Sequence, residues 1–133
     1  MKEALLDTDT VSYFLRKTPS VVSKVEAYAK EFGVLNISVI TFYEITNGLL
    51  AKDAKKQLGE FEAFLAYVNV LPVSLLGAKI SANICAALRK SGNLIGHNDI
   101  LIAGTAIEND MKLITNNQKD FSRIPGLDFE SWV

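Results

Sequence analysis

The sequence has little cysteine and no strong excess of charge. Cys85 is the single cysteine among 133 residues, which excludes an internal disulfide and any cysteine-based zinc cluster. Because it lies in an apolar helical stretch, we expect a buried structural thiol. The net charge of −1 and the pI of about 5.8 leave no general basic surface of the kind that many DNA-binding domains carry. Tight non-specific binding to duplexes is not expected, although a bound cation could still bring nucleic acid to an acidic site.

Long apolar runs, internal repeats and low-complexity segments are also missing. No apolar run reaches membrane-spanning length, and the segment MKEALLDTDT lacks the apolar core of a secretory signal. We therefore expect a cytoplasmic protein that does not bind membranes. No linker divides the chain, and 133 residues suffice to bury one core. The prediction is a single domain spanning residues 1–133.

Short apolar runs alternate with amphipathic stretches along the chain. The apolar runs predict strands at residues 4–6, 34–37, 70–73 and 112–115, with an edge strand within 127–132. Helical spacing predicts helices at residues 10–17, 20–32, 38–50, 52–69 and 75–90, and one that Asn98 caps. Parallel neighbours need crossover helices, so this alternation predicts an α/β fold. Its central, mostly parallel sheet would have four or five short strands flanked by helices.

Five acidic residues draw attention: Asp7, Asp9, Asp99 and Asp120 lie near the ends of these elements, and Glu44 lies inside the helix predicted at 38–50. Taken singly, each has a structural explanation. Thr8 or Asp9 could cap the first helix, as could Asp7, and Asp99 could interact with a helix dipole. Gathered at the carboxyl ends of parallel strands, however, the acids would repel one another unless a divalent cation lay between them. Oxygen-only ligands suit Mg²⁺ or Mn²⁺, and such a site supports phosphodiester hydrolysis.

Four segments in order over nearly the whole chain carry a more specific pattern: residues 5–9 (LLDTD), 37–48 (ISVITFYEITNG), 95–103 (IGHNDILIA) and 113–121 (LITNNQKDF). Together with residues 123–127 (RIPGL) and Trp132, they resemble the PIN-domain ribonucleases, most closely the VapC-type toxins of toxin–antitoxin pairs. The resemblance implies a PIN-like (Rossmann-like) three-layer fold and a Mg²⁺- or Mn²⁺-dependent endoribonuclease activity. It also implies inhibition by a cognate antitoxin whose tail covers the site.

Carried over residue by residue, the resemblance makes Asp7 and Asp99 the principal metal ligands. Glu44 would complete the catalytic cluster, either as a further ligand or as the group that orients the attacking water. Thr115 would form a hydrogen bond near the first acid. These assignments leave His97, the only histidine, to line the mouth of the site rather than to act as a base.

Two positions depart from the family pattern. Asp9 stands where the family often has asparagine, so it either adds a ligand or only caps a helix. Asn117 stands where many members place their fourth acid. That catalytic role then passes to Asp120 or is absent, although an asparagine can still hold a metal-bound water.

The partners implied by the resemblance are an RNA substrate, a cognate antitoxin and a second copy of the chain in a homodimer. A structured RNA with an exposed loop is the expected substrate, because single-stranded loops are the usual sites of sequence-specific recognition. The amphipathic stretches 20–32 and 52–69 either form a dimer or antitoxin surface or bury a core. Several basic side chains either contact RNA phosphates or only solubilise the protein: Arg16, Arg89, Lys90 and Arg123.

Two other functions fit part of the pattern. Residues 7–11 resemble the first motif of haloacid-dehalogenase-like phosphatases, with Asp7 as nucleophile, Asp9 as acid/base and Thr115 as the second motif. That family also requires a lysine and a paired acidic motif, for which too few residues follow Thr115, and it gives no role to Glu44 or Asp99. The non-enzymatic alternative is a PIN-like scaffold that binds a partner or RNA without cutting, which the asparagine at position 117 supports.

Overall fold

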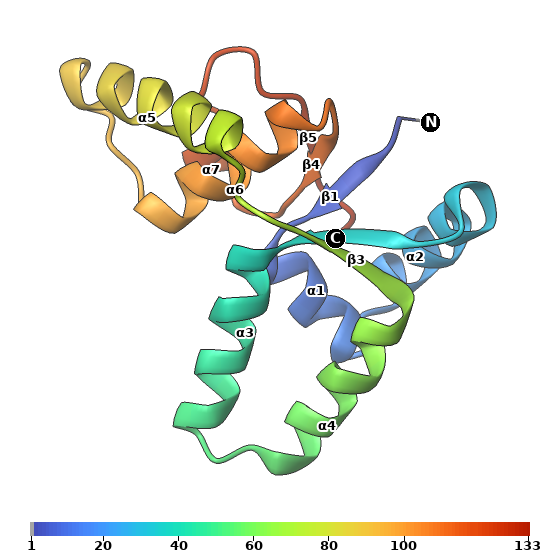
Figure 1. The fold of residues 1–133 in the computed structure, drawn as a ribbon. Helices are drawn as coiled ribbons and strands as arrows, with labels where there is room; N and C mark the ends of the chain where they lie inside the picture. Colours follow the sequence, from blue (N-terminus) through green and yellow to red (C-terminus); the bar gives the residue numbers. More distant parts are fainter. Residues whose placement is uncertain (1) are drawn as a thin grey trace.

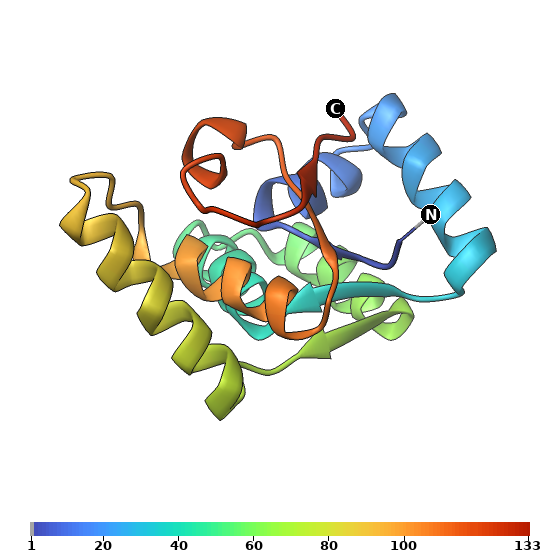
Figure 2. The ribbon, with the colours of Figure 1, turned by 90° about the horizontal axis from the view of Figure 1, so that it is seen from above.

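The computed structural model describes residues 2–133, in which five parallel strands form one sheet between two groups of helices (Figures 1 and 2). The strand order is β3-β2-β1-β4-β5. In chain order the strands are β1 (Ala4–Leu6), β2 (Leu35–Ser38), β3 (Val68–Leu71), β4 (Lys112–Ile114) and β5 (Phe129–Glu130). This confirms the predicted α/β fold, and the two-residue β5 is the edge strand expected within residues 127–132.

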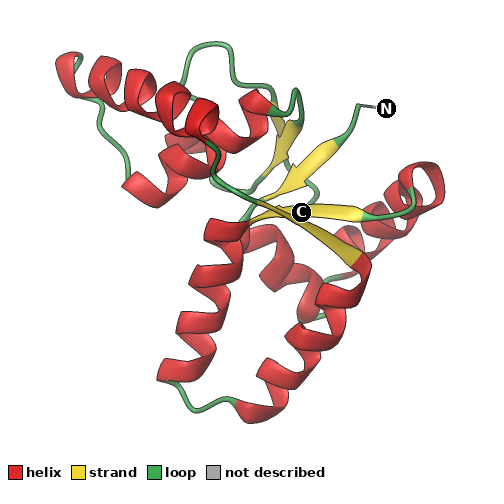
Figure 3. Cartoon of the chain, viewed as in Figure 1, coloured by secondary structure: helices red, strands yellow, loops and turns green. Residues whose placement is uncertain are grey.

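The helices connect these strands as the parallel topology requires (Figure 3). They are α1 (Thr8–Leu15), α2 (Pro19–Phe32), α3 (Val39–Ala51), α4 (Lys55–Phe64), a short 3₁₀ turn (Leu65–Tyr67), α5 (Leu75–Lys90), α6 (His97–Glu108) and α7 (Gln118–Phe121). None of the helices within residues 2–133 combines the length and the apolar character needed to cross a membrane. The cytoplasmic location stays a prediction.

Several predicted boundaries differ from the structure by one or two residues, as for the strand expected at 70–73, which is β3 at Val68–Leu71. Two of the errors have a clear physical cause. The first helix begins at Thr8 rather than at residue 10, because Asp7 itself is the N-cap. The stretch 52–69 is not one helix: a loop with Asp53 at a φ of 53° precedes α4, and the chain is already extended at Val68. Val68 pairs with Leu35 of β2, so pairing within the sheet overrides the continuing helical pattern.

The central strand β1 separates two apolar cores because its side chains alternate between the faces of the sheet. Leu6 packs in the core that α2 and α4 cover, with Tyr28 and Phe61. Leu5 packs in the core that α6 covers, with Ile102 and other apolar side chains. Both leucines are fully buried. β1 is thereby fixed in the middle of the molecule, and the residue that follows it inherits that fixed position.

Helices α5 and α6 approach each other unusually closely. A Cβ added at Gly104 of α6 would lie 2.0 Å from Ser81 Oγ and 3.0 Å from the carbonyl oxygen of Gly77, both on α5. Ser81 Oγ meanwhile donates a hydrogen bond to that same carbonyl (2.8 Å). Only a glycine at position 104 permits this crossing, which holds α6 and its first turn in place.

Candidate functional site

Asp7 lies at the centre of the sheet's carboxyl edge and is held by backbone and side-chain donors. It follows β1, and its amide donates to the Ile114 carbonyl of β4 (2.9 Å). Its Oδ1 accepts from the Thr8 amide (2.8 Å), which makes it the N-cap of α1. Its Oδ2 accepts from Thr115 Oγ1 (2.7 Å), as the resemblance implied. Asp7 as a whole is only 4% exposed, and these partners set the orientation of its carboxyl group.

Burial and neighbouring charges make ionisation of Asp7 costly. Burial, and after it the charge of Asp9, raises the pKa of Asp7 from 3.8 to about 7. The hydrogen bonds from Thr115 and Thr8 lower it in part, and the charge of Asp99 raises it further. An acid with a pKa this far above its ordinary value, at a strand end, is typical of a functional site.

Asp99 lies in the first turn of α6, as predicted, and belongs to the same electrostatic cluster. Burial raises its pKa from 3.8 to about 6, assisted by the charges of Glu44, Asp120 and Asp9 in that order. The structure therefore brings together all five acids proposed from the sequence, which we call the acidic cluster: Asp7, Asp9, Glu44, Asp99 and Asp120.

Glu44 is oriented by two side chains whose role the sequence did not reveal. Thr8 Oγ1 donates to Glu44 Oε1 (2.6 Å), and Asn98 Nδ2 donates to Glu44 Oε2 (3.4 Å). The prediction that Asn98 caps its helix was wrong, because α6 begins one residue earlier at His97, with Gly96 as N-cap. Because Asn98 lies inside the first turn of α6 and does not cap it, its side-chain amide is available to donate to Glu44. These bonds join α1, α3 and α6 around one carboxylate.

Asp9 and Asn117, at the two positions that depart from the family pattern, form hydrogen bonds that hold the turn after β4 next to the acidic cluster. Asp9 Oδ2 accepts from the Asn116 amide (3.0 Å), so it anchors this turn rather than capping α1. The backbone N–H of Asn117 donates to Thr115 Oγ1 (3.0 Å), and its side-chain Nδ2 donates to Asp120 Oδ2 (3.2 Å). Asn117 thus positions Asp120, whose charge acts on Asp99.

Cys85 and His97 lie outside the acidic cluster. Cys85 is half-buried rather than buried as expected. The close approach of α5 to α6 is at Ser81, one helical turn before Cys85, so Cys85 lies at the edge of this contact. Its Sγ lies 3.9 Å from His97 Nδ1 and 3.8 Å from Arg89 Nη2. His97 therefore contacts α5 and lines a hollow between α5 and α6, and the expectation that it lines the mouth of the acidic site was wrong.

The donor set fits a divalent cation by its chemistry. Within residues 2–133, no three His, Cys, Asp or Glu side chains are close enough to hold a metal ion as they stand. The cluster nevertheless offers oxygen ligands alone, which Mg²⁺ and Mn²⁺ prefer. Two of its acids, Asp7 and Asp99, have pKa values raised by burial and by the charges of neighbouring acids, and a cation would offset both effects.

Known proteins are similar to this chain over nearly its whole length. The PIN domain family matches residues 4–127. The chain is 33% identical over 130 residues to "Ribonuclease VapC2" of Rickettsia felis, covering 96% of each protein. It is 30% identical to the "tRNA(fMet)-specific endonuclease VapC" of Salmonella typhimurium, covering 99% of each. The solved structure of VapBC2 from Rickettsia felis, bound to a DNA fragment from its promoter, superposes with a TM-score of 0.90 at 31% identity, covering 98% of both chains. The chain therefore belongs to the PIN domain family, among its VapC members.

Proposed function

We propose that this protein is a metal-dependent endoribonuclease toxin that a cognate antitoxin inhibits. The observation that carries the proposal is the acidic cluster at the carboxyl ends of β1 and β4, where Asp7 and Asp99 have raised pKa values. Relatives named as ribonucleases and endonucleases over the full chain support the same activity. Because the chain belongs to the PIN domain family, we no longer consider the alternative function as a haloacid-dehalogenase-like phosphatase.

In this proposal Asp7 and Asp99 would hold Mg²⁺ or Mn²⁺, which would lower the pKa of a bound water and stabilise charge on the phosphate oxygens. The chain's own residues position the reactants. Thr115 and the Thr8 amide fix the Asp7 carboxylate. Glu44, held at both oxygens, orients the attacking water and accepts its proton. Attack on phosphorus with departure of the ribose 3′ oxygen leaves a 5′-phosphate and a 3′-hydroxyl.

The substrate we propose is a structured RNA cut in an exposed loop. Sequence-specific recognition of RNA usually takes place at unpaired bases, which a small site at a sheet edge can reach. The Salmonella typhimurium relative is named for a transfer RNA, which has this architecture. The chain's net charge of −1 makes tight general binding to RNA duplexes unfavourable, so recognition has to be local.

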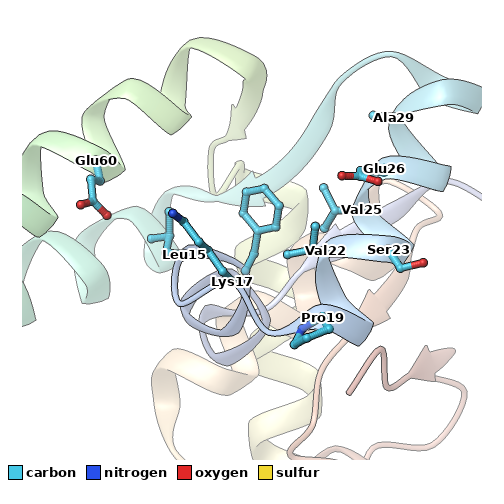
Figure 4. A pocket seen from close by; sticks show the side chains of 10 residues that line it. Leu15, Lys17, Pro19, Val22, Ser23, Val25, Glu26, Ala29 and Glu60 are labelled. Carbon is cyan, nitrogen blue, oxygen red and sulfur yellow. The ribbon is translucent and has the colours of Figure 1, made fainter.

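The antitoxin partner has a candidate docking groove on α1 and α2. A hollow of about 850 Å³ lies there, with Phe14, Val22 and Val25 on its walls and Lys17 and Glu26 among the charged residues that line it (Figure 4). We propose that an apolar antitoxin segment fills it, because exposed apolar surface is often found where a protein binds a partner. Similar chains occur in solved VapBC complexes. The amphipathic stretch 20–32 thus contributes both to the core and to this surface.

A homodimer is part of the proposal as well. Exposed apolar side chains project from α3 and from the start of α5: Tyr43, Leu50, Leu75 and Leu76. Burying such side chains between two copies is favourable by roughly 25 cal/mol per Å² of apolar surface. Light scattering on the purified chain is expected to give twice the mass of 14.6 kDa, and replacement of Leu75 and Leu76 by serine is expected to give the monomer.

Cleavage of total cellular RNA tests the proposed activity. Purified protein with Mg²⁺ or Mn²⁺ is compared with Asp7→Asn, with Asp99→Asn and with an EDTA control. Discrete fragments that disappear in both variants and in EDTA are the expected result. Intact RNA from antitoxin-free protein that demonstrably binds the metal would favour the non-cutting scaffold. Cleavage that survives both substitutions would indicate a contaminating nuclease.

A further inference from the structure

Helices α1 and α3 run side by side away from the acidic cluster (Figure 1). At the end nearest the cluster, Thr8 Oγ1 lies within hydrogen-bond distance of Thr41 Oγ1 (3.1 Å) and of Glu44 Oε1 (2.6 Å), both on α3. Residues four apart share one face of a helix. From this contact onward the two helices and their C-caps carry matched series at that spacing: Thr8, Ser12 and Arg16 on α1, and Glu44, Gly48 and Lys52 on α3.

The matched series line a continuous groove. Two adjoining hollows, of about 180 and 260 Å³, share four lining residues: Ser12, Ile45, Leu49 and Lys52. Thr8 and Glu44 line the first hollow, next to the cluster, and Arg16 lines the second. A Cβ added at Gly48 would meet nothing within 4 Å, so the middle of the groove is open. The groove leads from the acids to the C-terminal ends of both helices.

Two cations line the far end of the groove. Arg16 and Lys52 are the C-caps of α1 and α3, and both side chains are exposed. Neither forms a salt bridge within residues 2–133. The Arg16 guanidinium lies over the ring of Tyr13, 5.0 Å from its centre, which restricts its position. Glu60 of α4 is the one acid lining this end, so positive charge prevails there.

We propose that this groove binds the RNA strand on one side of the cleaved bond, with Lys52 and Arg16 each contacting a backbone phosphate. The proposal rests on the proposed nuclease function. Eight residues of helix separate Glu44 from Lys52, or about 12 Å at 1.5 Å per residue. A stacked strand rises about 3.4 Å per nucleotide, so the cations would contact phosphates about three to four nucleotides from the reacting one.

Charge and continuity favour RNA over a protein segment in this groove. Ser12 and Gly48 line its middle beside the apolar Ile45 and Leu49, and two exposed cations lie at its far end. The hollow that we assign to the antitoxin is a separate one, between α1 and α2. The groove also begins at Glu44, so a strand leaving the reacting phosphate would enter it directly. Arg16 and Lys52 lie at the end of the groove away from the acids, where each could pair with a phosphate of a nucleic-acid backbone.

The charge variants Lys52→Gln and Arg16→Gln test the phosphate contacts, with Lys56→Gln on the exposed face of α4 as matched control. Binding of a short fluorescent single-stranded RNA is measured in an Asp99→Asn background across salt concentrations. Each groove variant is expected to weaken binding about two- to fivefold. It is also expected to reduce the slope of log K against log salt by about 0.7, the value for one lost phosphate contact on a single strand. In the cleaving protein KM should rise with kcat unchanged, because the contact is distant from the reacting atoms.

Gly48→Leu tests the groove itself, with Gly59→Leu on α4 as matched control. Both glycines lie inside helices with open space at the Cβ position, and leucine is the better helix former, so both variants should fold. Gly48→Leu is expected to weaken RNA binding more than Lys52→Gln does, whereas Gly59→Leu binds like the parent.

The results separate this inference from the proposed function. Unchanged salt slope and KM in Lys52→Gln, with cleavage intact, would overturn the groove and leave the nuclease standing. Groove variants that weaken antitoxin binding but not RNA binding would overturn it in favour of a protein partner. RNA binding that depends on Lys52 in a protein that never cleaves would support the groove and refute the nuclease.

Discussion

Replacing Asp7 with asparagine is expected to stabilise the metal-free protein at pH 8. The carboxyl group is 4% exposed, and burial together with the charge of Asp9 raises its pKa from 3.8 to about 7. That difference of about three pKa units, at about 1.36 kcal/mol each, destabilises the folded state by about 4 kcal/mol once Asp7 is ionised. Because the folded pKa exceeds the unfolded one, the contribution of Asp7 to stability is greatest below about pH 4 and is lost as the pH rises through about 7.

Asparagine removes the charge and keeps the cap. It can still accept from the Thr8 amide and is a preferred N-cap residue. Its amide cannot replace the carboxylate as acceptor for Thr115, which costs about 1 kcal/mol or slightly more. The net gain expected at pH 8 is therefore about 2–3 kcal/mol, with none at pH 4.

Urea unfolding in EDTA at the two pH values measures this difference. Asp53→Asn serves as the control, because Asp53 is exposed and its left-handed backbone suits asparagine equally well. The control is expected to change stability by less than about 0.5 kcal/mol at both pH values. An Asp7→Asn protein that is no more stable than the parent at pH 8 would refute the reasoning that burial makes this charge costly.

Three further predictions follow from the packing and the hydrogen bonds. Gly104→Ala is expected to lower stability by about 1–3 kcal/mol in a thermal melt, because its Cβ would lie 2.0 Å from Ser81 Oγ. Asn98→Ala removes a hydrogen bond to Glu44 and is expected to lower kcat about tenfold in the RNA cleavage assay. Mg²⁺ added to metal-free protein at pH 8 is expected to raise the melting temperature, because bound cation offsets the repulsion within the acidic cluster; the rise should vanish in Asp99→Asn.

Each of these measurements has a result that would contradict it. A melting temperature for Gly104→Ala as high as that of Gly59→Ala would mean that α5 and α6 can separate without cost. Wild-type kcat in Asn98→Ala, whose thermal melt should match the parent, would mean that Glu44 needs no support from α6. A Mg²⁺ response that persists in Asp99→Asn would place the cation elsewhere on the protein.

Much of the fold could be predicted from local patterns because those patterns agree with the tertiary structure. The prediction of a helix at residues 75–90 is exact, since Ser74 caps α5 and its Oγ accepts from the Gly77 amide. Strand β1 was found at residues 4–6 because a short apolar run ends at Asp7. The parallel topology then placed Asp7 and Thr115 at one edge of the sheet, which the structure confirms.

The remainder depends on contacts that no local pattern encodes. Thr8 and Asn98 were interpreted only as helix caps, yet both donate to Glu44, from 36 and 54 residues away in the sequence. Which side chain orients a carboxylate depends on how α1, α3 and α6 pack. The end of α4 was missed for the same reason, since Val68 is extended only because it pairs with Leu35.

The order of strands in the sheet determines how late during synthesis the acidic site can assemble. The acidic cluster needs both Asp7 and Thr115, which are 108 residues apart. At about 5–20 residues per second, roughly 5 to 20 s pass between the synthesis of the two. Throughout that interval β1 has no β4 neighbour, and the Asp7 amide has no Ile114 carbonyl to bind. A nascent chain therefore carries an unassembled site until its last strands emerge, a delay imposed by topology on a protein whose completed site would cut RNA.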